Sequence, residues 1–244
     1  MGNPTTGLKI PLIIPTGVTS RKALPRRRKQ ECQFQLGTGS KGVPIPNPSM
    51  KLPNKKYNII YADPPWKYND RAKTQLADRG AEGKYNVMSV NEIANLPVKT
   101  ITANDCVLFL WITFPFLNEF TKVIDKWGFE YKTVAFTWVK TNASDSSVVY
   151  TDKSFFKGMG NWTRSNAEIC LLGTKGKPQR VSKGISQILV SHRGEHSAKP
   201  LVVRDKIVEL CGDLPRIELF SRHVVDGWDN WGSETHIKGQ KLLF

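Results

Sequence analysis

The sequence lacks the features of several protein classes. Its four cysteines are widely spaced and form no CxxC pair, which disfavours a zinc site or a disulfide framework and favours buried, reduced thiols. No apolar run approaches the roughly 20 residues of a membrane span, so no membrane partner is expected. The first residues contain prolines and no long apolar stretch, so we expect no signal peptide. An intracellular, cytoplasmic protein follows from these absences.

Acidic residues are also scarce. The chain of 244 residues has 36 Lys and Arg against 21 Asp and Glu, for a net charge of +15. Residues 1–56 hold 11 of the basic residues and 1 acidic residue, and they are rich in Pro and Gly. This composition predicts a largely irregular basic arm at 1–56 before a folded domain at 57–244. Because basic surface attracts polyanions, nucleic acid is the expected partner, with a solubilising arm as the alternative.

Strand and helix signals alternate after the arm. Apolar runs predict strands at Tyr57–Tyr61, Cys106–Ile112, Thr133–Val139, Glu168–Gly173, Ile185–Ser191 and Arg216–Phe220. Capping and periodicity predict helices at Ser89–Leu96, Pro115–Trp127 and Lys199–Cys211. The alternation is typical of an α/β domain with a mostly parallel central sheet flanked by helices. Two polar stretches interrupt it, Lys67–Lys84 and Thr141–Arg164, and we interpret both as loops that gate a substrate, with surface disorder as the alternative for Ser144–Lys153.

The tetrapeptide Asp63-Pro64-Pro65-Trp66 follows the first predicted strand directly. Ligands of open α/β sheets bind at the carboxyl ends of strands. Asp63 can accept a hydrogen bond from an exocyclic amino group, and Trp66 offers a ring for stacking. Because proline has no backbone N–H, the two consecutive prolines leave a nearby backbone carbonyl free to accept a hydrogen bond. The alternative is a plain strand-to-turn connection, but a turn does not need this carboxylate and this ring together. The tetrapeptide therefore predicts a site for a flat base that carries an amino group.

Further motifs follow the tetrapeptide in a fixed order. They are Lys84–Ser89, Leu108–Trp111, Trp127–Phe129, Trp138–Thr141, Gly158–Cys170, His196–Pro200, Ile217–Arg222 and Gly227–Gly232. Over residues 57–234, the set resembles the MT-A70 family of adenine-N6 methyltransferases. The resemblance implies a Rossmann-like class I methyltransferase fold with circularly permuted motif order, in which the catalytic strand comes early and the cofactor strand late. Such an order explains why no GxGxxG loop precedes Asp63.

The resemblance also implies roles for the residues that match the catalytic motifs. Asp63 and the Pro64 carbonyl would hold the target amino group, Pro65 would fix the turn, and Trp66 would line the base pocket or stack against the base. Tyr85 matches a tyrosine on the loop near the base. Together these five residues are the expected catalytic set.

S-adenosyl-L-methionine is the methyl donor that the resemblance implies, with no metal. Lys199 would neutralise the carboxylate of the donor or steady its ribose, and Asp63 would meet its ammonium group. The other expected cofactor-side residues are Glu218, Phe220, Arg222, Ser233 and Glu234. Without the resemblance, Glu218 also fits a surface carboxylate on an edge strand. His192–His196 formally fits an HxxEH zinc pattern, but that pattern needs a helix, which Gly194 disfavours.

These observations favour an enzyme that methylates N6 of adenine in DNA, similar to the bacterial or phage branch of the family. RNA is the closest alternative substrate. A non-catalytic nucleic-acid-binding subunit and a cytosine-N4 methyltransferase are further alternatives, although retention of Asp63, Trp66 and Lys199 argues against an inactive subunit. Whether the chain forms a homodimer or a heterodimer stays open.

Overall fold

The computed structural model describes residues 51–67, 87–142, 150–158, 160, 162–194 and 198–232. All of these residues belong to one compact unit, Lys41–Phe244. The predictions made for residues 1–50, Tyr85, Ser233 and Glu234 fall outside the described residues. So does nearly all of the first loop expected to gate the substrate, Lys67–Lys84.

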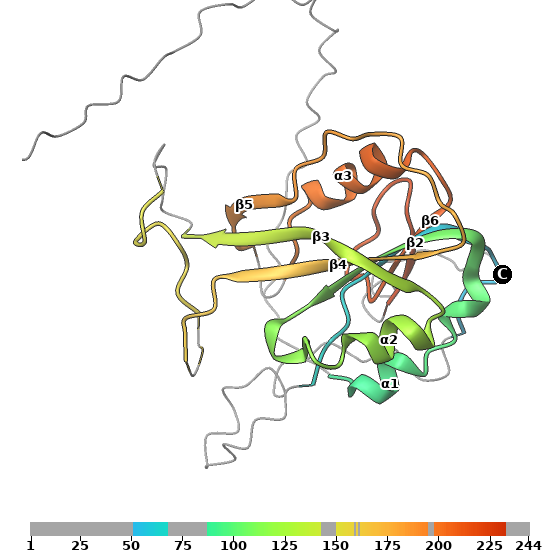
Figure 1. Ribbon diagram of the computed structural model, residues 1–244, viewed down its shortest axis with the longest axis horizontal. Coiled ribbons are helices and arrows are strands. Elements are labelled where there is room, and N and C mark those ends of the chain that lie inside the picture. Colours follow the sequence, from blue (N-terminus) through green and yellow to red (C-terminus); the bar gives the residue numbers. More distant parts are fainter. Residues whose placement is uncertain are drawn as a thin grey trace, which may run out of the picture. The chain divides into compact units, whose positions relative to one another are not determined.

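Seven strands form one sheet in the described part of the chain. They are β1 (Tyr57–Ala62), β2 (Thr102–Ile112), β3 (Glu130–Thr141), β4 (Ala167–Lys175), β5 (Ile188–His192), β6 (Arg216–Leu219) and β7 (Asp229–Trp231). Their order across the sheet is β5-β3-β4-β2-β1-β6-β7 (Figure 1). The first strand, β1, thus lies beside the late strand β6, as the permuted motif order requires.

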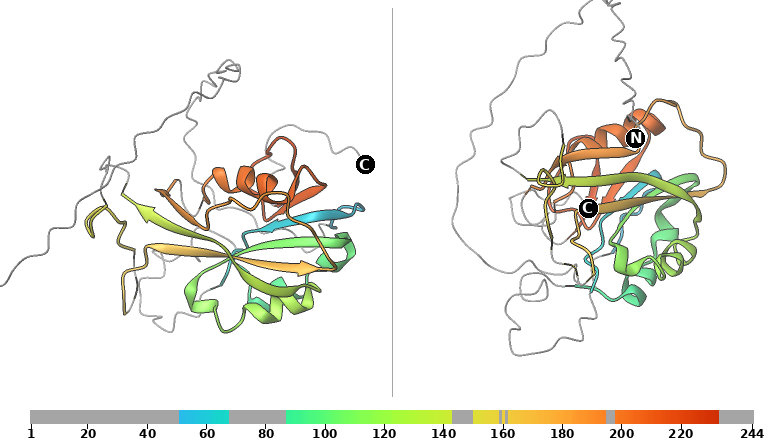
Figure 2. Two further views of the ribbon diagram at one scale, coloured as in Figure 1. Left: turned by 45° about the horizontal axis from the view of Figure 1, so that its top comes forward. Right: turned by 60° about the vertical axis from the view of Figure 1, so that its left-hand side comes forward.

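Within the described ranges, three α-helices cover the sheet. They are α1 (Val90–Ala94), α2 (Phe120–Lys126) and α3 (Val202–Cys211), with short 3-10 helices at Val98–Ile101 and Phe114–Phe116. Alternate residues of β1 serve two cores: Ile60 packs in the core that includes α1 and α2, whereas Ile59 packs in the core that includes α3. The helices accordingly lie on opposite faces of the sheet (Figures 1 and 2). Among the described residues, no helix is long and apolar enough to cross a membrane.

The predicted fold class, α/β with a mostly parallel sheet, is confirmed. All six predicted strands are present, and only β4 among the described strands runs against its neighbours. The sequence did not indicate β7, because three residues are too short for a periodic pattern. Helix α2 begins at Phe120 rather than Pro115, since a 3-10 helix at Phe114–Phe116 occupies the expected first turn.

The direction of β4 decides which residues meet at the carboxyl edge of the parallel strands. Ile112, at the end of β2, pairs with Ile169, near the start of β4. The start of β4 therefore lies beside the ends of β2 and β3. Residues just before Ile169 reach the same edge as the segment that follows β1.

The cysteines of the described residues are buried thiols, as expected. Cys106, Cys170 and Cys211 are free and buried, whereas Cys32 lies outside the described residues. Burial raises the pKa of Cys106 to about 12 and that of Cys211 to about 11. These groups are therefore protonated, unreactive parts of the core.

Candidate active site

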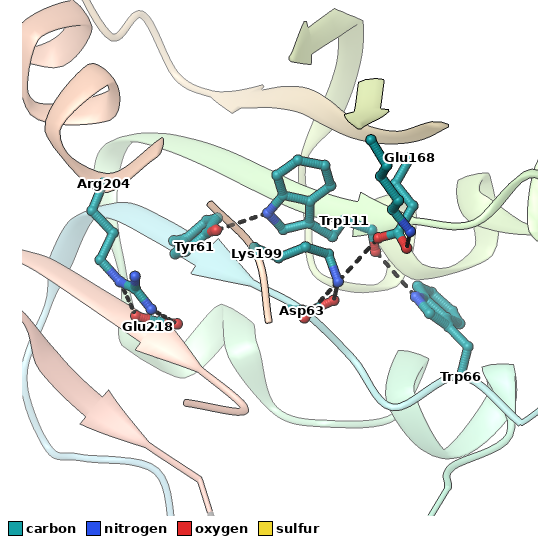
Figure 3. Close-up of polar contacts among 9 residues, drawn as sticks. Tyr61, Asp63, Trp66, Trp111, Glu168, Lys199, Arg204 and Glu218 are labelled. Carbon is teal, nitrogen blue, oxygen red and sulfur yellow. Dashed lines mark hydrogen bonds and ion pairs between the residues drawn. The ribbon is translucent and has the colours of Figure 1, made fainter. Parts of the chain in front are cut away.

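Asp63 and Lys199 meet at the carboxyl edge of the sheet although 136 residues separate them. Asp63 follows the last residue of β1, and Lys199 precedes α3. The Lys199 Nζ lies 2.7 Å from each carboxylate oxygen of Asp63 (Figure 3). The lysine side chain is 8% exposed and the aspartate side chain 23% exposed. The fold thus brings together the two residues that the sequence placed in the catalytic and cofactor sets, and it leaves the carboxylate partly accessible.

A second carboxylate, Glu168, completes this cluster and was not expected. Its Oε2 lies 3.2 Å from Lys199 Nζ, and its Oε1 accepts a hydrogen bond from Lys140 Nζ. The resulting row Asp63–Lys199–Glu168–Lys140 alternates in charge. A parallel β4 would place Glu168 at the opposite edge of the sheet, so the antiparallel direction of this strand was the missing information. Its only sequence signal is a glutamate at the start of a buried run.

The charges of the cluster shift one another's pKa values. Burial raises the pKa of the Asp63 carboxyl, and the positive charges of Lys199 and Arg222 oppose that shift. Burial alone would lower the pKa of Lys199, but Asp63 and Glu168 outweigh it and raise the pKa. Although burial acts against ionisation of Glu168, Lys199 and Lys140 hold its pKa below the usual value. Lys199 and Glu168 are therefore held in their charged forms, whereas burial favours the neutral form of Asp63.

The Pro64 carbonyl, which was expected to hold the target amino group, already accepts a hydrogen bond within the Pro64–Trp66 turn. The Trp66 amide donates to the Pro64 carbonyl at 2.9 Å, so that carbonyl already has one donor. One of its two lone pairs stays available for a second donor. The Pro65 carbonyl accepts from the Met88 amide at 2.7 Å, and the Met88 carbonyl accepts from Lys67 at 2.9 Å. The chain thus returns to the turn at Met88, three residues after Tyr85.

Trp66 is buried rather than open to solvent as a stacking platform. It is only 6% exposed. Its ring stacks on Phe116 with centroids 5.2 Å apart, and its Nε1 donates to the Trp111 carbonyl at 3.0 Å. The Trp111 indole in turn donates to the Tyr61 hydroxyl at 2.8 Å and lies under Lys199, whose Nζ is 5.5 Å from the ring centroid. Of the two roles expected for Trp66, lining fits this burial better than stacking.

Glu218 is held by Arg204, a residue that the sequence did not single out. Arg204 Nε and one terminal nitrogen donate to the two carboxylate oxygens of Glu218 at 2.6 and 2.7 Å (Figure 3). Glu218 is 6% exposed, and β6 lies between β1 and β7, so the alternative of a surface carboxylate on an edge strand is wrong. Arg204 also lies over the Tyr61 ring, 5.7 Å from its centroid. Its signal in the sequence is an arginine three residues before Ile207, on the buried side of α3.

The ends of β6 and β7 interlock next to this pair. Phe220 has a φ of 61°, which is rare for a residue with a side chain, and its ring meets Trp231 edge-on at 5.5 Å. The Ser221 amide donates to the Trp231 carbonyl at 3.2 Å. At Gly232 a Cβ atom would lie 2.2 Å from the Ser221 carbonyl oxygen, so only glycine permits this approach. Strained or crowded backbone of this kind is concentrated at ligand sites.

Comparison with known proteins agrees with this geometry. The family model MT-A70 matches residues 57–234. The chain belongs to the MT-A70 family. It is 38% identical to the Type II methyltransferase M.MunI of Mycoplasma sp. over 200 residues, which are 75% of this chain and 80% of that protein. It is 28% identical to the N(6)-adenosine-methyltransferase catalytic subunit METTL3 of Homo sapiens over 182 residues, which are 73% of this chain and 28% of METTL3.

Membership of the MT-A70 family confirms the resemblance inferred from the motifs. The matched range contains all residues expected in the site, from Asp63 to Glu234. Within the described part, Asp63 contacts Lys199, whereas Glu218 contacts Arg204. Arg222 is close enough to Asp63 for its charge to lower the aspartate pKa. The individual roles of these residues stay predictions.

The formal zinc pattern at His192–His196 does not form on a helix. His192 ends strand β5, and its Nδ1 lies 3.0 Å from the Thr141 hydroxyl. Glu195 and His196 lie outside the described residues. Within the ranges that the structure describes, no cluster of three or more His, Cys, Asp or Glu side chains could hold a metal ion.

Proposed function

We propose that this MT-A70 protein transfers a methyl group from S-adenosyl-L-methionine to N6 of adenine in DNA. The observation that carries the proposal is the Asp63 carboxylate, held by Lys199 at the carboxyl edge of the sheet and still partly exposed. The N(6)-adenosine specificity in the name of METTL3 supports adenine as the target base. We favour DNA because the chain is more similar to the Type II methyltransferase M.MunI, at 38% identity, than to METTL3, at 28% identity.

The residues at this edge fit the chemical groups of S-adenosyl-L-methionine. Its amino-acid end carries a carboxylate and an ammonium group, and the site offers the Lys199 cation and the Asp63 carboxylate side by side. The close approach of Gly232 to Ser221 brings together the backbone at the ends of β6 and β7, where Phe220 and Arg222 also lie. When bound, S-adenosyl-L-methionine supplies an electrophilic methyl group on a positively charged sulfur.

Asp63 would act on the nucleophile. The lone pair of the adenine amino nitrogen is delocalised into the ring, which makes the nitrogen a poor nucleophile. Hydrogen bonds from its two hydrogens to Asp63 and to the remaining lone pair of the Pro64 carbonyl would favour a pyramidal nitrogen and aim its lone pair. Lys199 keeps Asp63 oriented, and Glu168 keeps Lys199 in place.

The other expected residues complete the proposed site. Trp66 would form the wall of the base pocket, and Pro65 fixes the turn through its bond to Met88. Tyr85 would approach the base from the loop that ends near Met88. Glu218, Phe220, Arg222, Ser233 and Glu234 would line the cofactor side, with Glu218 positioned by Arg204.

Methyl transfer from isotope-labelled S-adenosyl-L-methionine to DNA tests the proposal. We expect labelled N6-methyladenine after digestion to nucleosides and mass spectrometry, and loss of at least about 100-fold in rate for Asp63→Ala. Asp213→Ala is the matched control, because Asp213 is exposed and pairs with Arg216 away from the site. Label in RNA alone would overturn the choice of DNA, and label in N4-methylcytosine would overturn the choice of base.

A further inference from the structure

Trp162 is fully exposed, with a relative accessible surface of 100%. Tryptophan is highly buried on average in soluble proteins, so an indole that packs against nothing calls for a partner. Trp162 belongs to the segment between β3 and β4, the yellow trace beyond the arrowhead of β3 in Figure 1. No role proposed so far uses this side chain.

The turn that carries Trp162 is built tightly. The Gly158 amide donates to the Ser165 carbonyl at 3.0 Å, which closes the turn at its base. A Cβ atom at Gly160 would lie 1.9 Å from the Thr163 carbonyl oxygen, and one at Gly158 would lie 2.5 Å from that of Ser165. Both glycines are therefore needed for the chain to turn here.

The residues that flank this turn are hydrogen-bonded to Lys140, which belongs to the row Asp63–Lys199–Glu168–Lys140. Phe156 donates its amide to the Lys140 carbonyl at 2.9 Å, and the Lys140 amide donates to the Asn166 carbonyl at 2.8 Å. The side chain of Lys140 binds Glu168, which holds Lys199. A continuous chain of contacts thus connects the turn of Trp162 to the site of Asp63, and both lie at the same edge of the sheet.

Positive charge and aromatic rings surround the turn. Residues 150–166 contain Lys153, Lys157 and Arg164 but a single acid, Asp152, which pairs with Lys157 at 2.8 Å. All three basic side chains are exposed. On neighbouring β5, the chain continues to Arg193, whose guanidinium lies 4.1 Å from the centroid of the Phe156 ring. Basic side chains around an exposed ring are the combination with which proteins hold the backbone and bases of a nucleic acid strand.

We propose that this surface, made by Trp162, Arg164, Arg193 and Phe156, docks the nucleic acid beside the target adenine, with Trp162 stacked on a base. The proposal rests on the proposed function, since it names where its substrate binds. The excess of exposed basic over acidic side chains around this turn fits a polyanion, because basic side chains contact phosphate groups whatever the base sequence. Stacking on Trp162 would return part of the energy needed to take the adenine out of its helix.

Fluorescence anisotropy with a labelled mixed-sequence DNA duplex containing adenines tests this surface. Trp162→Ala should raise the Kd by about 5-fold to 100-fold, and Trp162→Phe should restore most of the affinity because it keeps a ring. The slope of log K against log salt should not change for Trp162→Ala, whereas Arg164→Ala should reduce it by about 0.9. Val181→Ala is the control at an exposed apolar residue. Val181 is 69% exposed and lies beside the C-terminal end of α3, where its amide donates to the Leu210 carbonyl.

Two results would overturn the proposal. One is an unchanged Kd for DNA in Trp162→Ala. The other is a wild-type oligomer, seen by light scattering, that dissociates in Trp162→Ala, since the surface would then serve a protein partner. The wild-type chain and Trp162→Ala should bind S-adenosyl-L-methionine with the same affinity. If the wild-type chain methylates DNA and Trp162→Ala binds it unchanged, only the docking surface is wrong; if no nucleic acid is methylated, the proposed function is wrong whatever the anisotropy shows.

Discussion

Glu168 and Lys199 form an ion pair of 3.2 Å that links the start of an antiparallel strand to the segment before α3. The same lysine holds Asp63 at 2.7 Å on its other side. Lys199 therefore lies between two carboxylates, of which only Asp63 is proposed to contact the substrate. We infer that Glu168 is a positioning residue, since it acts on the reaction through Lys199.

Glu168→Gln tests this positioning role. The amide keeps the size of the side chain but loses the charge that helps to raise the pKa of Lys199. We expect kcat/KM to fall by about 10-fold to 100-fold, and the free energy of unfolding to fall by about 1–3 kcal/mol because charge-assisted hydrogen bonds are lost. Steady-state kinetics and urea unfolding measure the two effects. Glu209→Gln, an exposed change on α3, should alter neither.

Lys199→Met should weaken binding of S-adenosyl-L-methionine by at least about 10-fold, because the cation proposed to meet its carboxylate is lost. Isothermal titration calorimetry measures the affinity. Lys126→Met, at an exposed position of α2, is the control for removal of a positive charge. A wild-type chain that shows no binding heat at all would instead support the alternative of a non-catalytic subunit.

Loss of Arg204 alone should destabilise the fold more than loss of Arg204 and Glu218 together. Arg204→Met leaves a buried carboxylate without its two donors, and we expect a loss of about 3–5 kcal/mol in the free energy of unfolding. The double change Arg204→Met with Glu218→Met should recover most of that loss, because apolar side chains of similar length replace both charges. A double-mutant cycle in urea measures the coupling energy. Additive effects would mean that the two residues do not depend on each other.

Activity should depend on the ionisation of Asp63. Burial raises the pKa of this carboxyl, and the ionised form is the stronger acceptor for the amino hydrogen that Asp63 is proposed to bind. We therefore expect kcat/KM to fall as the pH is lowered, with an inflection above about 4, the ordinary pKa of aspartate. Because Lys199 opposes the rise in the Asp63 pKa, Lys199→Met should move the inflection to still higher pH. A profile whose inflection does not respond to this substitution would contradict the assignment.

Deletion of residues 1–50 should weaken binding to nucleic acid and flatten its dependence on salt. Residues 1–56 carry 11 basic side chains, so removing most of them removes phosphate contacts without removing the base pocket. Anisotropy with the same duplex at several salt concentrations measures the slope. A truncated chain with the slope of the full chain would identify residues 1–50 as a solubilising segment.

Much of the fold could be predicted from local patterns. Strands β1 and β6 appear in the sequence as short apolar runs of the expected length, and Ser89 with Glu92 forms the predicted capping box at the start of α1. Asp63 could be placed at a strand end for the same reason, since the tetrapeptide follows such a run directly. The order of the motifs then identified the MT-A70 family.

Other features needed contacts that local patterns do not contain. The sequence marks β4 as a strand but not as an antiparallel one, because strand direction depends on non-local pairing, here with β2 and β3. That direction alone brings Glu168 to Lys199. The grip of Arg204 on Glu218 likewise joins a helix to a strand across the core. The sequence by itself thus determined the family, six of the seven described strands and the position of Asp63. The tertiary structure decided which charges surround Asp63, because charge networks form between segments that only folding brings together.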